Sequence, residues 1–139
     1  MRKIFFDANI LVDLINSGNR NHRTVLFLFD QLVKQRRKLF VSPTSFAITY
    51  YFLSKNYKDL EKLNRLVIDF FSNFVFTRED DLTMEKVFKS GFTDLEDALQ
   101  YYSALDAGVD AIITYNKTDF VTSEIQVFHP IQFINEFLL

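Results

Sequence analysis

The chain has 139 residues, of which 48% are hydrophobic and 24% are charged, and it contains no cysteine. This length is typical of one domain with its own core, and the composition excludes disordered and fibrous proteins. Disulfide bonds and thiolate metal sites are excluded as well. The apolar run that follows Lys3 is too short for a signal peptide, and no stretch is long enough to span a membrane, so we expect a cytoplasmic protein.

Short apolar runs alternate with segments in which apolar residues recur at helical spacing. In chain order, the expected elements are a strand at residues 3–6, helices at 8–15 and 22–35, a strand at 39–41, helices at 43–55 and 58–73, a strand at 74–77, helices at 80–89 and 94–107, strands at 111–114 and 125–128, and a helix at 130–138. This alternation predicts the α/β class, with a central, mostly parallel sheet of four to five short strands flanked by helices, in one domain over residues 1–139.

Two of the predicted helices carry capping signals at their starts. Ser42 followed by Pro43 is typical of an N-cap and of the first helical position. Thr93 is expected to cap a helix that begins at Asp94, with Glu96 completing a capping box.

Charge is unevenly distributed along the chain, although the net charge is only −2. Residues 1–65 hold 12 Lys and Arg against 5 Asp and Glu, whereas residues 66–139 hold 4 against 13. Such an asymmetry can mark a basic surface beside an acidic site. The alternative is that the two halves intermix in space, and then the asymmetry has no functional meaning.

Polar side chains are expected at one edge of the predicted sheet, beyond the carboxyl ends of its strands. Asp7 ends the first strand, Asp94 and Asp97 begin the helix before a buried strand, and Asn116 and Asp119 follow that strand. Ligands of open parallel sheets bind at this edge, and oxygen donors suit Mg²⁺ or Mn²⁺. We therefore expect Asp7, Asp97 and Asp119 to converge at a distance that one cation can bridge.

Each of these residues also has a structural interpretation. Asp7 is in place to cap the following helix, and Asp94 and Glu96 are in a first helical turn, which favours acids through the helix dipole. Asp119 is in place for a turn with Phe120. Asp97 lies further inside its helix, so for this residue we favour a functional role over such a structural one.

Three segments together resemble the PIN-domain family. They are Phe6-Asp7-Ala8-Asn9-Ile10-Leu11-Val12-Asp13, then Asp94-Leu95-Glu96-Asp97-Ala98-Leu99-Gln100-Tyr101 with Ala104 beyond it, and Gly108-Val109-Asp110-Ala111-Ile112-Ile113-Thr114-Tyr115-Asn116-Lys117-Thr118-Asp119-Phe120. Their order and spacing match the family, and the resemblance covers nearly the whole chain.

The resemblance implies a ribonuclease that uses Mg²⁺ or Mn²⁺, similar to the VapC-type toxins of toxin–antitoxin pairs. It implies RNA, in single-stranded regions, as substrate, a small antitoxin as partner, and a homodimer. By position, Asp7, Asp97 and Asp119 are the catalytic residues. The implied metal ligands are Asp7, Asp94, Asp97, Asn116 and Asp119, and the implied supporting residues are Asn9, Glu96 and Thr114.

Two departures from the family pattern leave alternatives open. The family carries a glutamate in the helix after the second strand, whereas residues 42–55 contain no acid, and Asn116 stands where an aspartate is common. A PIN module that binds RNA or a protein with weak or no catalysis is therefore the alternative function. A phosphatase with Asp7 as nucleophile is a third reading, although Asn9 replaces the second aspartate of that pattern and Lys117 is the only candidate lysine.

Phosphate binding needs positive charge. The candidate RNA-binding residues are Arg20, Arg23, Arg36, Arg37, Lys38 and Lys117. The cluster at 36–38 follows a long helix, where cations also belong because of the helix dipole.

Overall fold

The computed structural model describes residues 1–120 and 124–139. Within them, five strands form one parallel sheet in the order β3-β2-β1-β4-β5. The strands are β1 (Lys3–Phe6), β2 (Lys38–Val41), β3 (Val75–Phe76), β4 (Ala111–Ile113) and β5 (Gln126–Phe128). The predicted α/β class with a parallel sheet is confirmed.

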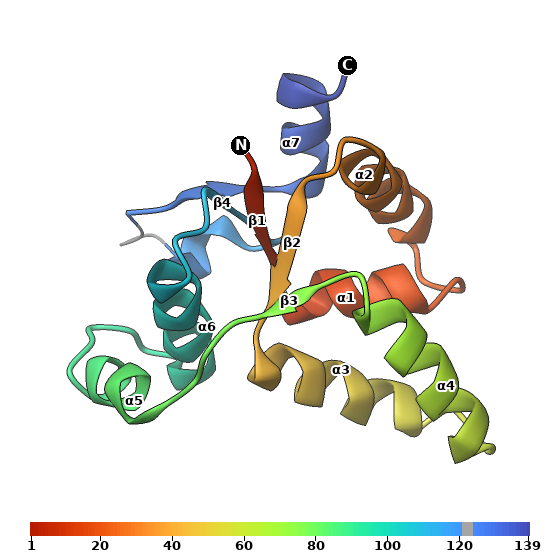
Figure 1. The fold of residues 1–139 in the computed structure, drawn as a ribbon, viewed down its shortest axis with the longest axis horizontal. Coiled ribbons are helices and arrows are strands. Elements are labelled where there is room, and N and C mark those ends of the chain that lie inside the picture. The colour runs from red at the N-terminus through yellow and green to blue at the C-terminus, as the bar shows by residue number, and fades with distance from the viewer. Residues whose placement is uncertain (121–123) are drawn as a thin grey trace.

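Helices cover both faces of the sheet (Figure 1). Five of them pack on one face, and α5 and α6 lie on the other together with the short 3₁₀ helix η1. The bounds are α1 (Ala8–Ile15), α2 (His22–Lys34), α3 (Pro43–Ser54), α4 (Leu60–Phe71), α5 (Asp81–Phe88), α6 (Leu95–Asp106), η1 (Lys117–Phe120) and α7 (Pro130–Phe137). Every helix in the described part of the chain is too short or too polar to cross a lipid bilayer.

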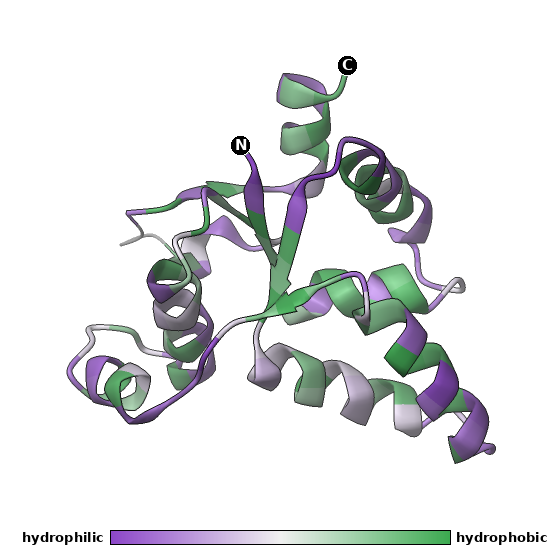
Figure 2. Cartoon of the chain, in the orientation of Figure 1, coloured by the Kyte–Doolittle hydropathy of each residue, from purple (hydrophilic) through white to green (hydrophobic). Residues whose placement is uncertain are grey.

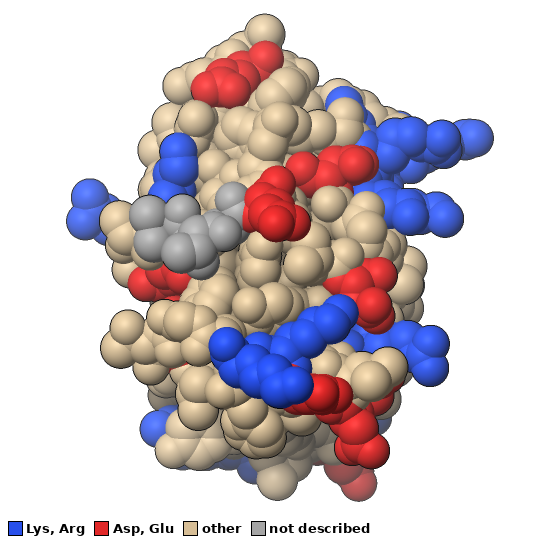
Figure 3. Space-filling model, turned by 90° about the vertical axis from the view of Figure 1, so that its left-hand side faces the viewer, with Lys and Arg blue, Asp and Glu red and all other residues tan. Residues whose placement is uncertain are grey.

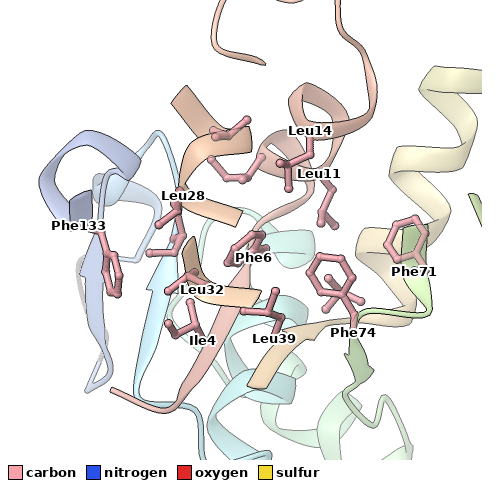
Figure 4. Packing of buried hydrophobic residues seen from close by; sticks show 14 of the residues in the cluster. Ile4, Phe6, Leu11, Leu14, Leu28, Leu32, Leu39, Phe71, Phe74 and Phe133 are labelled. Atoms are coloured by element: carbon pink, nitrogen blue, oxygen red, sulfur yellow. The ribbon is translucent and has the colours of Figure 1, made fainter. Parts of the chain in front are cut away.

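Alternation along the strands builds a core on each face. Ile4 and Phe6 join the larger core, whereas Phe5 between them joins the smaller one, because successive strand side chains point to opposite faces. The larger core gathers side chains from α1, α2, α4 and α7 around β1 (Figure 4). All three of these strand residues are fully buried, so β1 is the central strand in packing as well as in sheet order.

One predicted helix start is confirmed and one is wrong. Ser42 caps α3, because its hydroxyl accepts from the Ser45 amide at 2.9 Å. The predicted box of Thr93 and Glu96 does not form. Asp94 itself takes the N-cap conformation, and its Oδ1 accepts from the amides of Glu96 and Asp97 at 2.9 and 3.3 Å. A carboxylate at the positive end of the helix dipole is the better acceptor, so the helix begins one residue later than predicted.

The strand order places the carboxyl ends of β1 and β4 next to each other. The chain moves from β1 outward to β2 and β3, and then returns to the other side of β1 with β4. Phe6 at the end of β1 pairs with Ile113 at the end of β4. This reversal of strand order is the point at which open α/β sheets bind their ligands.

Two helices end in the same left-handed turn with different residues. After α6, Gly108 takes a positive φ of 70°, and the amides of Gly108 and Val109 bond back to the carbonyls of Leu105 and Ala104. After α2, Arg36 takes this place with a φ of 56°, and the Arg36 and Arg37 amides bond back in the same pattern. Glycine adopts this conformation without the steric cost that arginine meets.

The variant Arg36→Gly should therefore be more stable than the wild type. We expect a gain of about 0.5–1 kcal/mol in the free energy of unfolding, which is the relieved steric cost less the greater flexibility of glycine in the unfolded chain. Urea denaturation measures this difference. Arg36→Ala keeps a Cβ and is the control that should show no gain. A loss of stability in the glycine variant would contradict the conclusion that Arg36 pays a steric cost in this left-handed turn.

Candidate active site

Asp7 is a buried carboxylate at the end of the central strand, 5% exposed. Its Oδ2 accepts a hydrogen bond from Thr114 Oγ1 at 2.7 Å, across 107 positions of sequence. Burial raises the pKa of Asp7 above its ordinary value, and the Thr114 hydroxyl, the Ala8 backbone amide and the Gln100 side chain partly oppose that rise. Although Asp7 holds the N-cap position, within the described residues its side chain makes no capping bond to α1. Helix capping therefore does not account for this carboxylate.

Asp97 carries the strongest sign of crowded negative charge. Its pKa is raised from 3.8 to about 7, first by burial and then by the neighbouring carboxylates of Asp119, Asp94, Asp7 and Glu96. Four acids from three separate segments thus act on one side chain. Like charges at this range repel each other unless a cation lies between them.

Asp94, Asp97 and Asp119 line a pocket of about 230 Å³ beside the start of α6. Its other walls are residues 91–93 and Thr118, so Lys and Arg are absent from the lining that the structure describes. The pKa of Asp119 is raised by burial and by Asp94. One oxygen of Asp94 caps α6, which leaves Oδ2 for a ligand.

Asn116 holds the η1 loop that carries Asp119. Its amide Nδ2 donates to Asp119 Oδ1 at 2.8 Å, and its Oδ1 accepts from Thr118 Oγ1 at 2.6 Å. The Asn116 backbone amide donates to Thr114 Oγ1 at 3.2 Å. Thr114 therefore connects Asp7 to this loop, and Asn116 orients Asp119.

Gln100 and Ser45 were not among the site residues predicted from the sequence. Gln100 is 3% exposed on α6, and its Oε1 accepts from Ser45 Oγ on α3 at 2.8 Å. The Gln100 side chain also lies close enough to the Asp7 carboxylate to favour its ionised form. The available signal was a glutamine on the buried face of a helix, one turn after Asp97, where an apolar residue is the rule.

The remaining predicted site residues lie at the margin of this cluster, and of them Glu96 also raises the pKa of Asp97. Asn9 and Glu96 are exposed on the first turns of α1 and α6. Lys117 begins η1 next to Asn116, and its Nζ donates to Gln132 Oε1 at 3.0 Å.

The structure does not bring the predicted basic residues together at the site, Lys117 excepted. Lys38 begins β2 and pairs with Lys3, so Arg36, Arg37 and Lys38 are at the amino edge of the sheet, opposite Asp7. Arg20 and Arg23 lie beyond the far end of α1, an eight-residue helix of about 12 Å. On the face over α5 and α6, Lys and Arg side chains are interspersed with Asp and Glu (Figure 3).

The chemistry of these residues fits a divalent cation. In residues 1–120 and 124–139, no Lys or Arg forms an ion pair with the clustered carboxylates. Asp7, Asp97 and Asp119 share one edge, as predicted. However, no group of three or more acidic or histidine side chains in the described chain is already arranged to hold a metal. The bridging distance predicted for Asp7, Asp97 and Asp119 is therefore not present in the described chain.

The crowding of carboxylates around Asp97 predicts that Asp97→Asn stabilises the metal-free protein. The folded state binds the Asp97 proton more tightly than the unfolded state, so wild-type stability falls as pH rises from about 4 to about 7. The variant removes that loss, by less than about 1 kcal/mol because Asp97 is partly exposed to solvent. In EDTA, its melting temperature should exceed the wild-type value at pH 8 and approach it at pH 5.

Asp110→Asn is a matched control with the opposite sign. Asp110 accepts from the amides of Arg2 and Lys3 at 2.9 and 3.0 Å, which holds its pKa below the ordinary value. Its charge stabilises the fold above pH 4, so this variant should melt lower than the wild type at pH 8. If Asp97→Asn melted below the wild type at pH 8, the result would contradict the claim that the neighbouring carboxylates destabilise the charged form of Asp97.

Comparison with known proteins shows which family this chain resembles. A model of the PIN domain matches residues 3–118. Ribonuclease VapC1 of Aquifex aeolicus (strain VF5) is 28% identical over 132 residues, which cover 90% of this chain and 88% of the relative.

Two solved structures illustrate the likeness in fold. VapBC2 of Rickettsia felis, bound to a DNA fragment from the promoter, superposes with a TM-score of 0.66 at 18% identity, covering 91% of this chain and 98% of that one. VapC20 of Mycobacterium tuberculosis, a toxin that cleaves the sarcin–ricin loop, superposes with a TM-score of 0.65 at 13% identity, covering 86% and 94%. The family model spans most of the chain, and the resemblance read from the sequence is confirmed: the chain belongs to the PIN-domain family.

Proposed function

We propose that the protein is a metal-dependent endoribonuclease and the toxin of a toxin–antitoxin pair. The observation that carries this proposal is the crowding of carboxylates around Asp97 without a Lys or Arg partner in the described chain. Such a cluster is costly to the fold and becomes favourable once a cation is bound. The relative VapC1, whose name is that of a ribonuclease, supports RNA as the substrate.

Asp7, Asp97 and Asp119 would hold Mg²⁺ or Mn²⁺, with Asp94 Oδ2 at the rim of the site. A divalent ion in such a site lowers the pKa of a bound water and neutralises charge on the scissile phosphate. Thr114 favours the ionised form of Asp7 by donating to it, and Asn116 keeps Asp119 directed at the pocket. Asn9 and Glu96 remain supporting candidates at the exposed margin.

Lys117 is the basic residue best placed for an RNA phosphate, because it begins the η1 loop that carries Asp119. Arg20 and Arg23 would contact RNA only at a distance from the reacting phosphate. Arg36, Arg37 and Lys38, at the opposite edge, would need a strand that wraps around the molecule.

A non-catalytic module is the second candidate, and one observation favours it. Helix α3 contains no acid, so the site has fewer carboxylates than the family pattern provides. Fewer negative charges weaken cation binding, and RNA or protein binding without cleavage would then remain. The cleavage assay below separates the two functions.

Exposed apolar side chains on α3 and α4 support a protein partner. Tyr50 Oη donates to Asn64 Oδ1, so the two helices lie side by side. Tyr51, Phe52, Leu60 and Ile68 on them are 47–71% exposed, and both helices carry hydrophobic stretches (Figure 2). We propose that a second copy of the chain, and in the cell a small antitoxin, covers apolar surface of this kind. The solved relatives that are toxin–antitoxin complexes support an antitoxin partner.

Light scattering should give about twice the mass of the 16.4 kDa chain at micromolar concentration. Ile68→Glu, which places a charge on α4, should shift the protein to a monomer without unfolding it, because this side chain is 71% exposed. Phe88→Glu on α5 is the matched control, since it is 72% exposed on the other face. A monomeric wild type would refute the dimer.

Purified protein should cut single-stranded RNA in Mg²⁺ or Mn²⁺ and stop in EDTA, leaving 5′-phosphate and 3′-hydroxyl ends. We expect Mn²⁺ to be the better cofactor, because a site short of carboxylates favours the ion that binds more tightly in general. Asp97→Asn should lower the cleavage rate by about two orders of magnitude or more. Gel electrophoresis of labelled RNA measures both.

Asp110→Asn is again the control, because Asp110 is at the opposite edge of the sheet and should leave cleavage at the wild-type rate under conditions where it stays folded. Cleavage that survives EDTA would contradict the metal-dependent reaction. Folded protein, free of any inhibitory partner, that cuts nothing with either metal would establish the non-catalytic module instead.

A further inference from the structure

A buried hydrogen bond joins α3 to Gln100 on α6, and the Gln100 side chain lies beside the carboxylate of Asp7. Ser45 Oγ on α3 donates to Gln100 Oε1 at 2.8 Å. Because the Gln100 carbonyl oxygen is used in this way, its amide NH₂ is the group that faces Asp7, whose ionised form the Gln100 side chain favours. Gln100 is 3% exposed and Ser45 is fully buried.

Ser45 is itself fixed by the start of α3. Its amide donates to Ser42 Oγ at 2.9 Å, and the two hydroxyls are 2.7 Å apart. The N-cap of α3 therefore sets the position of Ser45, and Ser45 sets which end of the Gln100 amide meets Asp7. An amide that lacked this partner could turn its oxygen toward the carboxylate, which would repel it.

The Asp7 carboxylate thus accepts a hydrogen bond from Thr114 on β4 and lies beside the neutral amide of Gln100 on α6. Neither group adds charge, and both limit how the carboxylate can turn. A buried carboxylate held in this way presents its remaining lone pairs in one direction. Residues that orient a ligating carboxylate contribute strongly to metal affinity although they never touch the ion.

We propose that Gln100, held by Ser45, is a positioning residue that orients the Asp7 carboxylate toward the reacting phosphate and its cation. This inference rests on the proposed nuclease function. It gives α3, which carries no acid, a contribution to the site through the hydroxyl of Ser45.

Gln100→Leu removes the donor to Asp7 at similar volume. The dissociation constant for Mn²⁺, measured by calorimetry without RNA, should rise about tenfold, within the range of such outer-shell substitutions. The kcat for RNA cleavage should fall by a similar factor, while KM for RNA stays near the wild-type value, because the phosphate-contacting groups are unchanged.

Ser45→Ala is the second variant, and it keeps the test decisive if Gln100→Leu does not fold. It removes one hydroxyl and leaves Gln100 in place, so it should weaken Mn²⁺ binding in the same direction by a smaller factor. Thr49→Val is its control. Thr49 is fully buried on α3, and its hydroxyl bonds the Ser45 carbonyl at 2.8 Å without reaching Gln100. It should lower the melting temperature and leave the Mn²⁺ affinity unchanged.

Three outcomes are distinguishable. Weaker Mn²⁺ binding in both Gln100→Leu and Ser45→Ala, with wild-type affinity in Thr49→Val, supports positioning. Wild-type affinity and kcat in both variants, with only lower melting temperatures, overturns the positioning role and leaves the nuclease intact. A wild type that binds no Mn²⁺ overturns the proposed function and this inference together.

Discussion

The negative charge gathered at the carboxyl edge of β1 and β4 is the constraint on which the site depends. Asp7 is 5% exposed at the end of the central strand, and burial together with four neighbouring acids raises the pKa of Asp97 to about 7. The described chain supplies no cation to this cluster. The fold therefore accepts an electrostatic cost at this one edge, which a hydrophobic core on each face of the sheet outweighs.

Neutral hydrogen-bond donors make that cost tolerable. Thr114 reaches Asp7 from β4, Asn116 reaches Asp119 within the η1 loop, and the Asp94 carboxylate is occupied by the first amides of α6. These contacts hold the carboxylates in place without cancelling their charge. A site arranged in this way still attracts a cation, whereas ion pairs with Lys or Arg would have neutralised its negative charge.

Periodicity in the sequence predicted the order and type of the elements, because each buried face repeats every two or every 3.6 residues. The positions of Asp7, Asp97 and Asp119 at one edge followed from strand polarity alone. The cap of α6 was assigned wrongly because Thr93 and Asp94 are both good caps, and only the backbone conformation separates them. Ser45 and Gln100 were missed because their pairing joins positions 55 residues apart. The distance of Arg36, Arg37 and Lys38 from the site was missed because a local cluster of charge does not reveal which edge of a sheet it occupies.

Crystals soaked in Mn²⁺ test the central claim most directly, because anomalous scattering locates that ion without reference to activity. The account predicts one anomalous peak at the carboxyl edge of the sheet, within about 2.5 Å of carboxylate oxygens of both Asp7 and Asp97. A protein that binds Mn²⁺ only elsewhere on its surface, with Asp7 and Asp97 left without the ion, would contradict it.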